Sequence, residues 1–528
     1  MRTSTVFALG LASGASGLAT PPDVRLNVAR AAPDSPSGAT RPPCWLEARE
    51  PKTKTALDNF LKRVNIADFD YASYLQTDGA YPRISIAMSG GGYRALLNGA
   101  GFIYAADDRT GGDSGISGLL QASTYFSGLS GGGWLVSTIY GNNFTTIESL
   151  MSDEDVWQFR PRYWRDLHDQ VSSKQDAGFD VSLTDYWGRA VSYQLLRGDE
   201  GGAAYTFSSI ADAEDFKNGE TPFPILVADG RAPDTKIINL NSTVFEFNPF
   251  ELGSWDPTLY GFAPLDYIGS NFTGGRVDDK GSCVRGFDQL GFVMGTSSSL
   301  FNMALLTDIP DSPLIQPIRE VDVIFAVDSS ADTTYNWPNG TALRASYERS
   351  LNSIANGTHF PAVPDAETFV NLKFNQEPVF FGCDAANFSS EGGSAPPLIV
   401  YIPNAPLSGF SNVSTFDPTH EIDERNDIVQ NGYNVATRGN GTLDDAWPTC
   451  VACAALSRSF ERTGTTPPQA CQDCFNRYCW NGQLDTTAVS SYEPGLILNA
   501  EADSGSFKMA ASTALWIVPA AAAWLLTA

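Results

Sequence analysis

Short apolar runs bounded by glycine, proline, asparagine and aspartate recur along the chain, and several alternate with segments of helical character. The apolar, β-rich runs predict strands at residues 83–88, 123–129 and 321–327. Residues 93–106 and 132–140 each follow a glycine-rich turn and are predicted to be helices. Strands that alternate with helices favour an α/β fold, with a central mixed sheet, flanking helices and one large domain.

The two ends of the chain differ from this pattern. Residues 1–19 combine Arg2 with a short apolar run, which is typical of a secretory signal peptide, although a buried N-terminal helix is an alternative. Residues 20–42 are rich in Pro, Ala and Ser and are expected to form a flexible leader. The folded domain is therefore expected to span residues 43–490.

The last twenty residues are apolar or small throughout and follow a run of small residues around Ser504. Small residues, a short spacer and an apolar tail are typical of a glycosylphosphatidylinositol (GPI) attachment signal. We expect residues 491–504 to link the domain to the anchor and residues 505–528 to be removed. Ser504 is the expected attachment site, with Asp503, Gly505 and Asn499 as alternatives. A true membrane anchor and a buried helix are the alternatives.

Charge and glycosylation motifs agree with an extracellular location. The net charge of -26 argues against binding to nucleic acid, because the phosphate backbone attracts the opposite sign. Eight N-x-S/T motifs predict N-glycosylation on exposed loops. The sequence thus predicts a glycoprotein on the outer side of the plasma membrane, held there by GPI, or in the cell wall or secreted. The eight asparagines are Asn143, Asn241, Asn271, Asn339, Asn356, Asn387, Asn412 and Asn440.

The chain contains eight cysteines, five of them between residues 450 and 479. Two C-x-x-C pairs, beginning at Cys450 and Cys471, have a spacing compatible with a zinc ribbon. An oxidising secretory route and an even number of cysteines favour disulfides instead, with no structural metal. The pairing cannot be read from the sequence. We expect this region to be a disulfide-stapled C-terminal lobe of the main domain.

The segment Gly128-Leu129-Ser130-Gly131-Gly132 matches the G-x-S-x-G pattern. In this pattern a serine lies on a sharp strand-to-helix turn with its hydroxyl exposed. The sequence therefore predicts a serine acyl hydrolase with Ser130 as the nucleophile.

A serine nucleophile needs a base, and the chain offers only three histidines: His168, His359 and His420. None lies in a sequence context that marks it as catalytic, so exposed or structural roles are expected for all three. Asp328 lies at the end of an apolar run, and sites of open α/β sheets gather at the carboxyl ends of strands. Asp328 could therefore take the serine proton directly; the alternative is that it caps the following helix.

A second glycine-rich segment, residues 89–95, lies upstream of Ser130. Its glycines present backbone N–H groups without side-chain obstruction, as an oxyanion hole requires. Arg94 follows closely and could bind a phosphate or a carboxylate through paired hydrogen bonds. Nucleotide binding and a plain turn are the alternatives for this loop. No Lys-Ser/Thr follows it, which excludes a Walker motif.

Three ordered segments, residues 89–95, 127–132 and 327–332, resemble the signature blocks of the fungal lysophospholipase (phospholipase B) family, whose catalytic domain is related to that of the cytosolic calcium-dependent phospholipases. Residues 184–190 and 291–298 add to the likeness, which extends over about residues 43 to 490. The sequence departs from the pattern at Gly133, where many members have serine.

The resemblance implies a patatin-like or cytosolic-phospholipase-like catalytic domain that hydrolyses acyl esters of lysophospholipids and, as a further option, of diacyl phospholipids. It implies a histidine-free dyad of Ser130 and Asp328, oxyanion donors at Gly91 and Gly92, and Arg94 on the lipid phosphate. Transacylation would follow if a lysophospholipid replaced water. No cofactor and no calcium requirement are expected. The alternatives are a histidine-dependent secreted lipase and a catalytically silent cell-wall glycoprotein.

Overall fold

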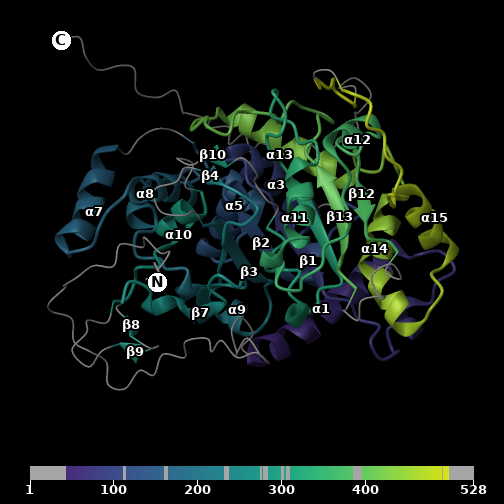
Figure 1. The fold of residues 1–528 in the computed structure, drawn as a ribbon, viewed down its shortest axis with the longest axis horizontal. Coiled ribbons are helices and arrows are strands. Elements are labelled where there is room, and N and C mark those ends of the chain that lie inside the picture. Colours follow the sequence, from purple (N-terminus) through teal and green to yellow (C-terminus); the bar gives the residue numbers. More distant parts are fainter. Residues whose placement is uncertain are drawn as a thin grey trace, which may run out of the picture.

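The fold is built on a nine-stranded mixed sheet (Figure 1). The computed structural model describes residues 43–110, 114–159, 164–230, 237–270, 272–273, 276–277, 284–298, 303–304, 310–384, 395–489 and 492–498. The strand order is β12-β13-β11-β1-β2-β3-β5-β6-β7. The strands are β1 (Ile84–Met88), β2 (Ser123–Leu129), β3 (Phe223–Asp229), β5 (Val244–Phe247), β6 (Glu251–Ser254), β7 (Gly261–Pro264), β11 (Val323–Asp328), β12 (Val379–Phe381) and β13 (Leu398–Pro403).

The middle of the sheet is parallel and its margins are antiparallel. Strands β13, β11, β1, β2 and β3 pair in parallel, whereas β12 on one side and β5, β6 and β7 on the other run antiparallel to their neighbours. All residues of β1, β2, β11 and β13 are buried. Central parallel strands are covered on both faces, which explains why they read as continuous apolar runs.

Helices cover both faces of the sheet. Helices α3 and α5 lie on one face and α11 on the other (Figure 1), while α13 packs against α3. The longer helices are α1 (Pro43–Val64), α3 (Tyr93–Ala106), α5 (Gly131–Gly141), α7 (Trp164–Asp176), α8 (Leu183–Leu195), α10 (Leu290–Ser297), α11 (Thr341–Ser350), α13 (Ile422–Thr437), α14 (Trp447–Thr463) and α15 (Gln469–Tyr478). Short helices are α2 (Tyr71–Tyr74), α4 (Leu119–Ala122), α6 (Ile147–Met151), α9 (Glu214–Lys217) and α12 (Ala366–Asn371).

The α/β class predicted from the sequence is confirmed. The predicted strands correspond to β1, β2 and β11, the last of which begins two residues later than expected and includes Asp328. Helix α3 has the predicted bounds, and α5 is longer than predicted by one residue at each end.

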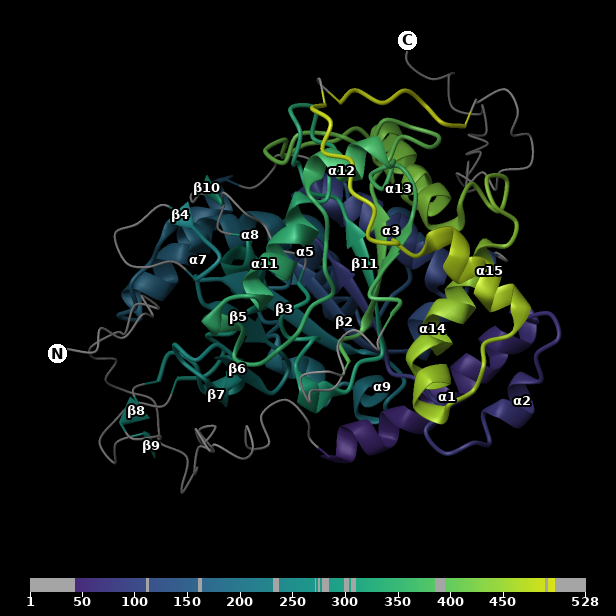
Figure 2. The same cartoon turned by 45° about the vertical axis from the view of Figure 1, so that its right-hand side comes forward.

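The C-terminal helices form the expected disulfide-stapled lobe. Helix α14 packs against α1, and α15 packs against α14 and the edge strand β12 (Figure 2), so the N-terminal and C-terminal helices meet there. Two disulfides, Cys450–Cys474 and Cys453–Cys471, join α14 to α15. The C-x-x-C spacing therefore reflects two helices cross-linked to each other, and the zinc-ribbon alternative is wrong.

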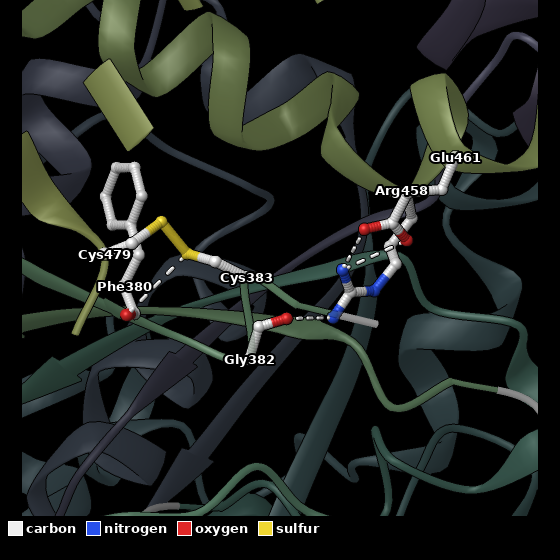
Figure 3. Close-up of a disulfide and its surroundings, with 6 residues drawn as sticks. All are labelled: Phe380, Gly382, Cys383, Arg458, Glu461 and Cys479. Carbon is white, nitrogen blue, oxygen red and sulfur yellow. Dashed lines mark hydrogen bonds and ion pairs between the residues drawn. A yellow bond between two sulfur atoms is a disulfide. The ribbon is translucent and has the colours of Figure 1, made fainter. Parts of the chain in front are cut away.

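A third disulfide, Cys383–Cys479, ties the segment after β12 to the end of α15 (Figure 3). Beside it, the Arg458 guanidinium of α14 donates to the carbonyl oxygen of Gly382 at 2.6 Å and pairs with Glu461 at 3.0 Å. This lobe is therefore joined to the edge of the sheet by both covalent and polar contacts. The side chains of the two other cysteines, Cys44 and Cys283, lie outside the described residues.

Several predictions about the chain ends fall outside the described residues: the signal peptide, the leader and Ser504. Within the described ranges, no helix is both long and apolar enough to cross a bilayer. Of the predicted glycosylation sites, four are exposed and two are half-buried, while Asn271 and Asn387 are not described. The exposed sites are Asn143, Asn241, Asn356 and Asn440, and the half-buried ones are Asn339 and Asn412.

Candidate active site

Ser130 occupies a strained turn between β2 and α5. Its backbone has φ 52° and ψ -117°, a positive φ that is uncommon for a residue with a side chain. Its N–H donates to the Ser297 hydroxyl at 2.8 Å, and that hydroxyl donates to the carbonyl oxygen of Val227 at 2.6 Å. Helix α10 and strand β3 thus hold the turn. A half-buried serine at the start of a helix is the arrangement that the G-x-S-x-G pattern predicts.

The glycine loop after β1 lies directly beside this turn. A β-carbon added to Gly90 would stand 3.3 Å from the Ser130 β-carbon, and one added to Gly131 would collide with the carbonyl oxygen of Gly92. Gly91 and Gly92 have φ of 137° and 62°, conformations that favour glycine. Within the described ranges the N–H groups of Gly91 and Gly92 donate to no protein acceptor. They are therefore free to donate to a bound group.

Ser89 joins this loop to the strands on both sides. Its N–H donates to the carbonyl oxygen of Val327 at 3.0 Å, and its own carbonyl accepts from the N–H of Gly132 at 3.2 Å. The Ser89 hydroxyl also accepts from the N–H of Ser329 at 2.7 Å. The three sequence segments that carried the family resemblance therefore meet at one edge of the sheet.

Asp328 ends β11 at this same edge, two strands from Ser130. Met88 of β1 faces both Val327 and Gly128 in register, so the ends of β11 and β2 lie at the same height with the glycine loop between them. The Asp328 side chain is fully buried, and its two oxygens accept from the Tyr401 hydroxyl at 2.7 Å and from the N–H of Ser330 at 2.9 Å. Burial raises the pKa of Asp328, and these hydrogen bonds oppose that shift.

Arg94 is fixed in the interior. Its Nε donates to the carbonyl of Ser329 at 2.8 Å, Nη1 to the carbonyl of Val413 at 2.7 Å, and Nη2 to the hydroxyl of Thr415 at 3.0 Å. Burial lowers the pKa of Arg94 to about 10, partly offset by nearby carboxylates. In this conformation the guanidinium joins α3 to the loops after β11 and β13, and its contact with a lipid phosphate stays a prediction.

Of the three histidines, two are exposed and one is buried. His168 and His359 are exposed. His420 is buried, with its ring packed edge-on against Tyr93 and Phe159 at centroid distances of 5.6 and 6.3 Å. No hydrogen bond within the described ranges joins a histidine to Ser130.

Sequence reasoning did not single out two side chains that contact the site. Tyr401 lies in the buried strand β13, where its hydroxyl is the one polar side-chain group. A single hydroxyl in an otherwise apolar strand is the feature of the sequence that could have indicated a role for Tyr401. Ser297 lies in residues 291–298, which matched the family pattern without a role. The structure gives it one, because its hydroxyl binds the backbone of Ser130.

Two further carboxylates surround Asp328. Asp311 is fully buried, and burial together with repulsion from Asp328 raises its pKa to about 7. The pKa of Asp332 is raised to about 7 for the same reasons. The Asp328 carboxylate therefore lies in a region where negative charge is costly.

A large cavity lies at the opposite edge of the sheet. It has a volume of about 1270 Å³, and its lining includes Arg83, Thr124, Asp322 and Pro397. These residues stand at or next to the starts of four central strands, whereas Ser130 and Asp328 stand at the carboxyl ends. We place the active site at the carboxyl ends, because the strained serine and the free N–H groups lie there.

Comparison with known proteins identifies the family. The family model for the lysophospholipase catalytic domain matches residues 84–308 and 305–485. The chain belongs to the lysophospholipase family. Lysophospholipase 1 of Aspergillus fumigatus is 47% identical and aligns with 90% of this chain and 89% of its own length. The lysophospholipase of Penicillium chrysogenum is also 47% identical, with 92% of each chain covered. The predicted family and enzyme class, a lysophospholipase hydrolase, are confirmed.

A solved structure extends the likeness of the fold. Human GIVD cytosolic phospholipase A2, in complex with methyl gamma-linolenyl fluorophosphonate, superposes with a TM-score of 0.57 at 16% identity. The match covers 80% of this chain and 64% of that one. At this identity the comparison confirms the cytosolic-phospholipase-like fold.

Proposed function

We propose that this protein hydrolyses the fatty acyl ester of lysophospholipids through an acyl-serine intermediate on Ser130. The strained turn carries this proposal: it presents a half-buried serine hydroxyl beside a glycine loop with two free N–H groups. The curated relatives named lysophospholipase, which cover about nine tenths of the chain, support the substrate class.

The reaction begins when the Ser130 hydroxyl attacks the ester carbonyl carbon. Its proton passes to the Asp328 carboxylate as the new C–O bond forms, and negative charge develops on the carbonyl oxygen. The N–H groups of Gly91 and Gly92 stabilise that charge, since they have no other acceptor in the described part. The bond to the glycerol oxygen then breaks, and the proton on Asp328 passes to the departing glycerophospho-alcohol.

The second half of the reaction frees the fatty acid. Water attacks the acyl-serine and gives a proton to Asp328, which returns it to the Ser130 oxygen as the fatty acid leaves. A second lysophospholipid in place of water would give transacylation. Arg94 would contact the lipid phosphate; in the present conformation each of its three nitrogens donates one hydrogen bond to the protein, and the guanidinium has five N–H groups in all.

The predicted location completes the proposal. We propose a GPI-anchored glycoprotein on the outer face of the plasma membrane, with the cell wall and the medium as the alternative locations. The support comes from the signal-like ends of the sequence and from four exposed glycosylation motifs, at Asn143, Asn241, Asn356 and Asn440.

A fluorophosphonate with a fatty chain tests the nucleophile. The probe should form one covalent adduct, on the peptide that contains Ser130, and Ser130→Ala should abolish both the adduct and fatty acid release from lysophosphatidylcholine. Ser137→Ala is the control, because it removes a buried hydroxyl of α5 that has no hydrogen-bond partner among the described residues. It should leave both the adduct and fatty acid release intact. An adduct on another serine, or residual activity in Ser130→Ala, would refute the proposal.

A further inference from the structure

The residue that contacts Asp328 most directly comes from the neighbouring strand. Tyr401 of β13 pairs with Ala326 of β11, so its side chain lies on the same face of the sheet as Asp328, two residues further along. The Tyr401 hydroxyl and the Asp328 Oδ2 atom are 2.7 Å apart, and both side chains are fully buried. The contact is therefore shielded from water.

The direction of this hydrogen bond is fixed. Burial, followed by the negative charges of Asp328 and Asp332, raises the pKa of Tyr401 well above 10, so the phenol keeps its proton. An ionised carboxylate can only accept, so Tyr401 donates. The ring is held in place by edge-on packing against Phe369, with centroids 5.4 Å apart.

The second oxygen of Asp328 also has a fixed donor, the N–H of Ser330 at 2.9 Å. These two donors, one on each oxygen, set the plane of the carboxylate, and the side chains of Ser330 and Ser89 add hydrogen bonds that favour its charged form. We propose that Tyr401 is a positioning residue, which orients the Asp328 carboxylate toward the Ser130 proton and keeps it ionised. This proposal rests on the proposed role of Asp328 as the base.

The charges around Asp328 explain why such a donor is needed. Asp332 and Asp311 repel a charge on Asp328, whereas Arg94 is the nearby cation and is already bound to three protein acceptors. Burial adds to the cost of the charged form. A neutral phenol that keeps its proton stabilises the carboxylate without adding a competing base.

The chain contains a matched control for removal of this hydroxyl. Tyr125 of β2 is also buried, and its hydroxyl has no hydrogen-bond partner in the described part of the chain. Tyr125→Phe thus removes the same atom from another buried strand of the same sheet without changing a contact to Asp328. Effects of both substitutions on packing can be compared through the unfolding temperature.

The test is the pH dependence of kcat/KM for fatty acid release from lysophosphatidylcholine by the full chain. In Tyr401→Phe, the acidic limb should move up by about one pH unit, and the activity below it should fall about tenfold. KM should change little, since Tyr401 is expected to contact the base and not the lipid. Tyr125→Phe should retain the acidic limb of the unsubstituted protein.

Two outcomes would contradict the proposal in different ways. If Asp328→Asn is inactive but Tyr401→Phe has the same acidic limb as Tyr125→Phe, the positioning role is wrong and the dyad stands. If Asp328→Asn remains active, the dyad itself is wrong, and the role of Tyr401 falls with it. The rate of fluorophosphonate labelling as a function of pH provides a second readout that does not depend on lipid binding.

Discussion

At the scale of single residues, two features position Ser130: the strained conformation of its backbone and a hydrogen bond from its N–H to a neighbouring side chain. A positive φ at a serine is costly, and such strain persists only when the surroundings fix it. The Ser297 hydroxyl is one such constraint, because it links the N–H of Ser130 to the carbonyl of Val227 in the adjacent strand. This contact therefore fixes the backbone of the turn that carries the Ser130 hydroxyl.

Removal of the Ser297 hydroxyl should lower activity without unfolding the protein. We expect Ser297→Ala to reduce kcat about tenfold to hundredfold, because the turn can then relax and misplace the nucleophile. Loss of the hydroxyl removes two hydrogen bonds, one from the N–H of Ser130 and one to the carbonyl of Val227, and should cost about 1–3 kcal/mol in the free energy of unfolding. Steady-state kinetics and thermal denaturation measure the two effects.

Ser137→Ala is the control for this substitution, because it deletes a buried serine hydroxyl on α5 that has no partner in the described part. It should leave kcat unchanged. Equal losses of kcat in Ser297→Ala and Ser137→Ala would show that general packing, and not support of the turn, accounts for the effect.

At the scale of elements, local signals in the sequence predicted the strands and helices that carry the chemistry. The apolar runs of β1, β2 and β11 and the glycine turns between strand and helix were sufficient, because each is encoded within about ten residues. Ser130, Asp328 and the glycine loop follow from those elements. The side chains that come from distant segments, Tyr401 and Ser297, could not be predicted in this way, because strand order and helix packing bring them to the site.

Long-range packing also explains the segments that matched the family without an evident role. Residues 184–190 and 291–298 belong to α8 and α10, which cross where Gly188 and Gly291 approach so closely that a β-carbon would collide. This crossing positions the end of α10, and with it Ser297. The cysteine pairing could not be predicted from the sequence either, because C-x-x-C spacing fits two cross-linked helices as well as a metal site.

At the scale of the whole molecule, buried carboxylates link stability to pH. The pKa values of Asp311 and Asp332 are raised to about 7 and that of Asp229 to about 6, chiefly by burial. A raised pKa means that the folded state binds protons more tightly than the unfolded chain, so the contribution to stability is full below about pH 4 and is lost as pH rises through 6 and 7. Asp229 and Asp332 keep some exposed surface, so fully buried Asp311 should contribute most.

We therefore expect the unfolding temperature to be higher at pH 5 than at pH 7.5, by roughly 3–5 °C for a chain of this size. Asp311→Asn should reduce this difference, because it removes one of the titrating groups. Differential scanning calorimetry of both proteins across this range is the measurement. An unfolding temperature that rises from pH 5 to pH 7.5 would contradict the raised pKa values.

The central claim is that an aspartate, without a histidine, serves Ser130. The most direct test compares kcat for fatty acid release from lysophosphatidylcholine in Asp328→Asn and His420→Gln, each checked for folding by thermal denaturation. The dyad predicts that Asp328→Asn lowers kcat by about 10³-fold or more, while His420→Gln retains kcat within about threefold. Activity retained in Asp328→Asn, or lost in a folded His420→Gln variant, would contradict it.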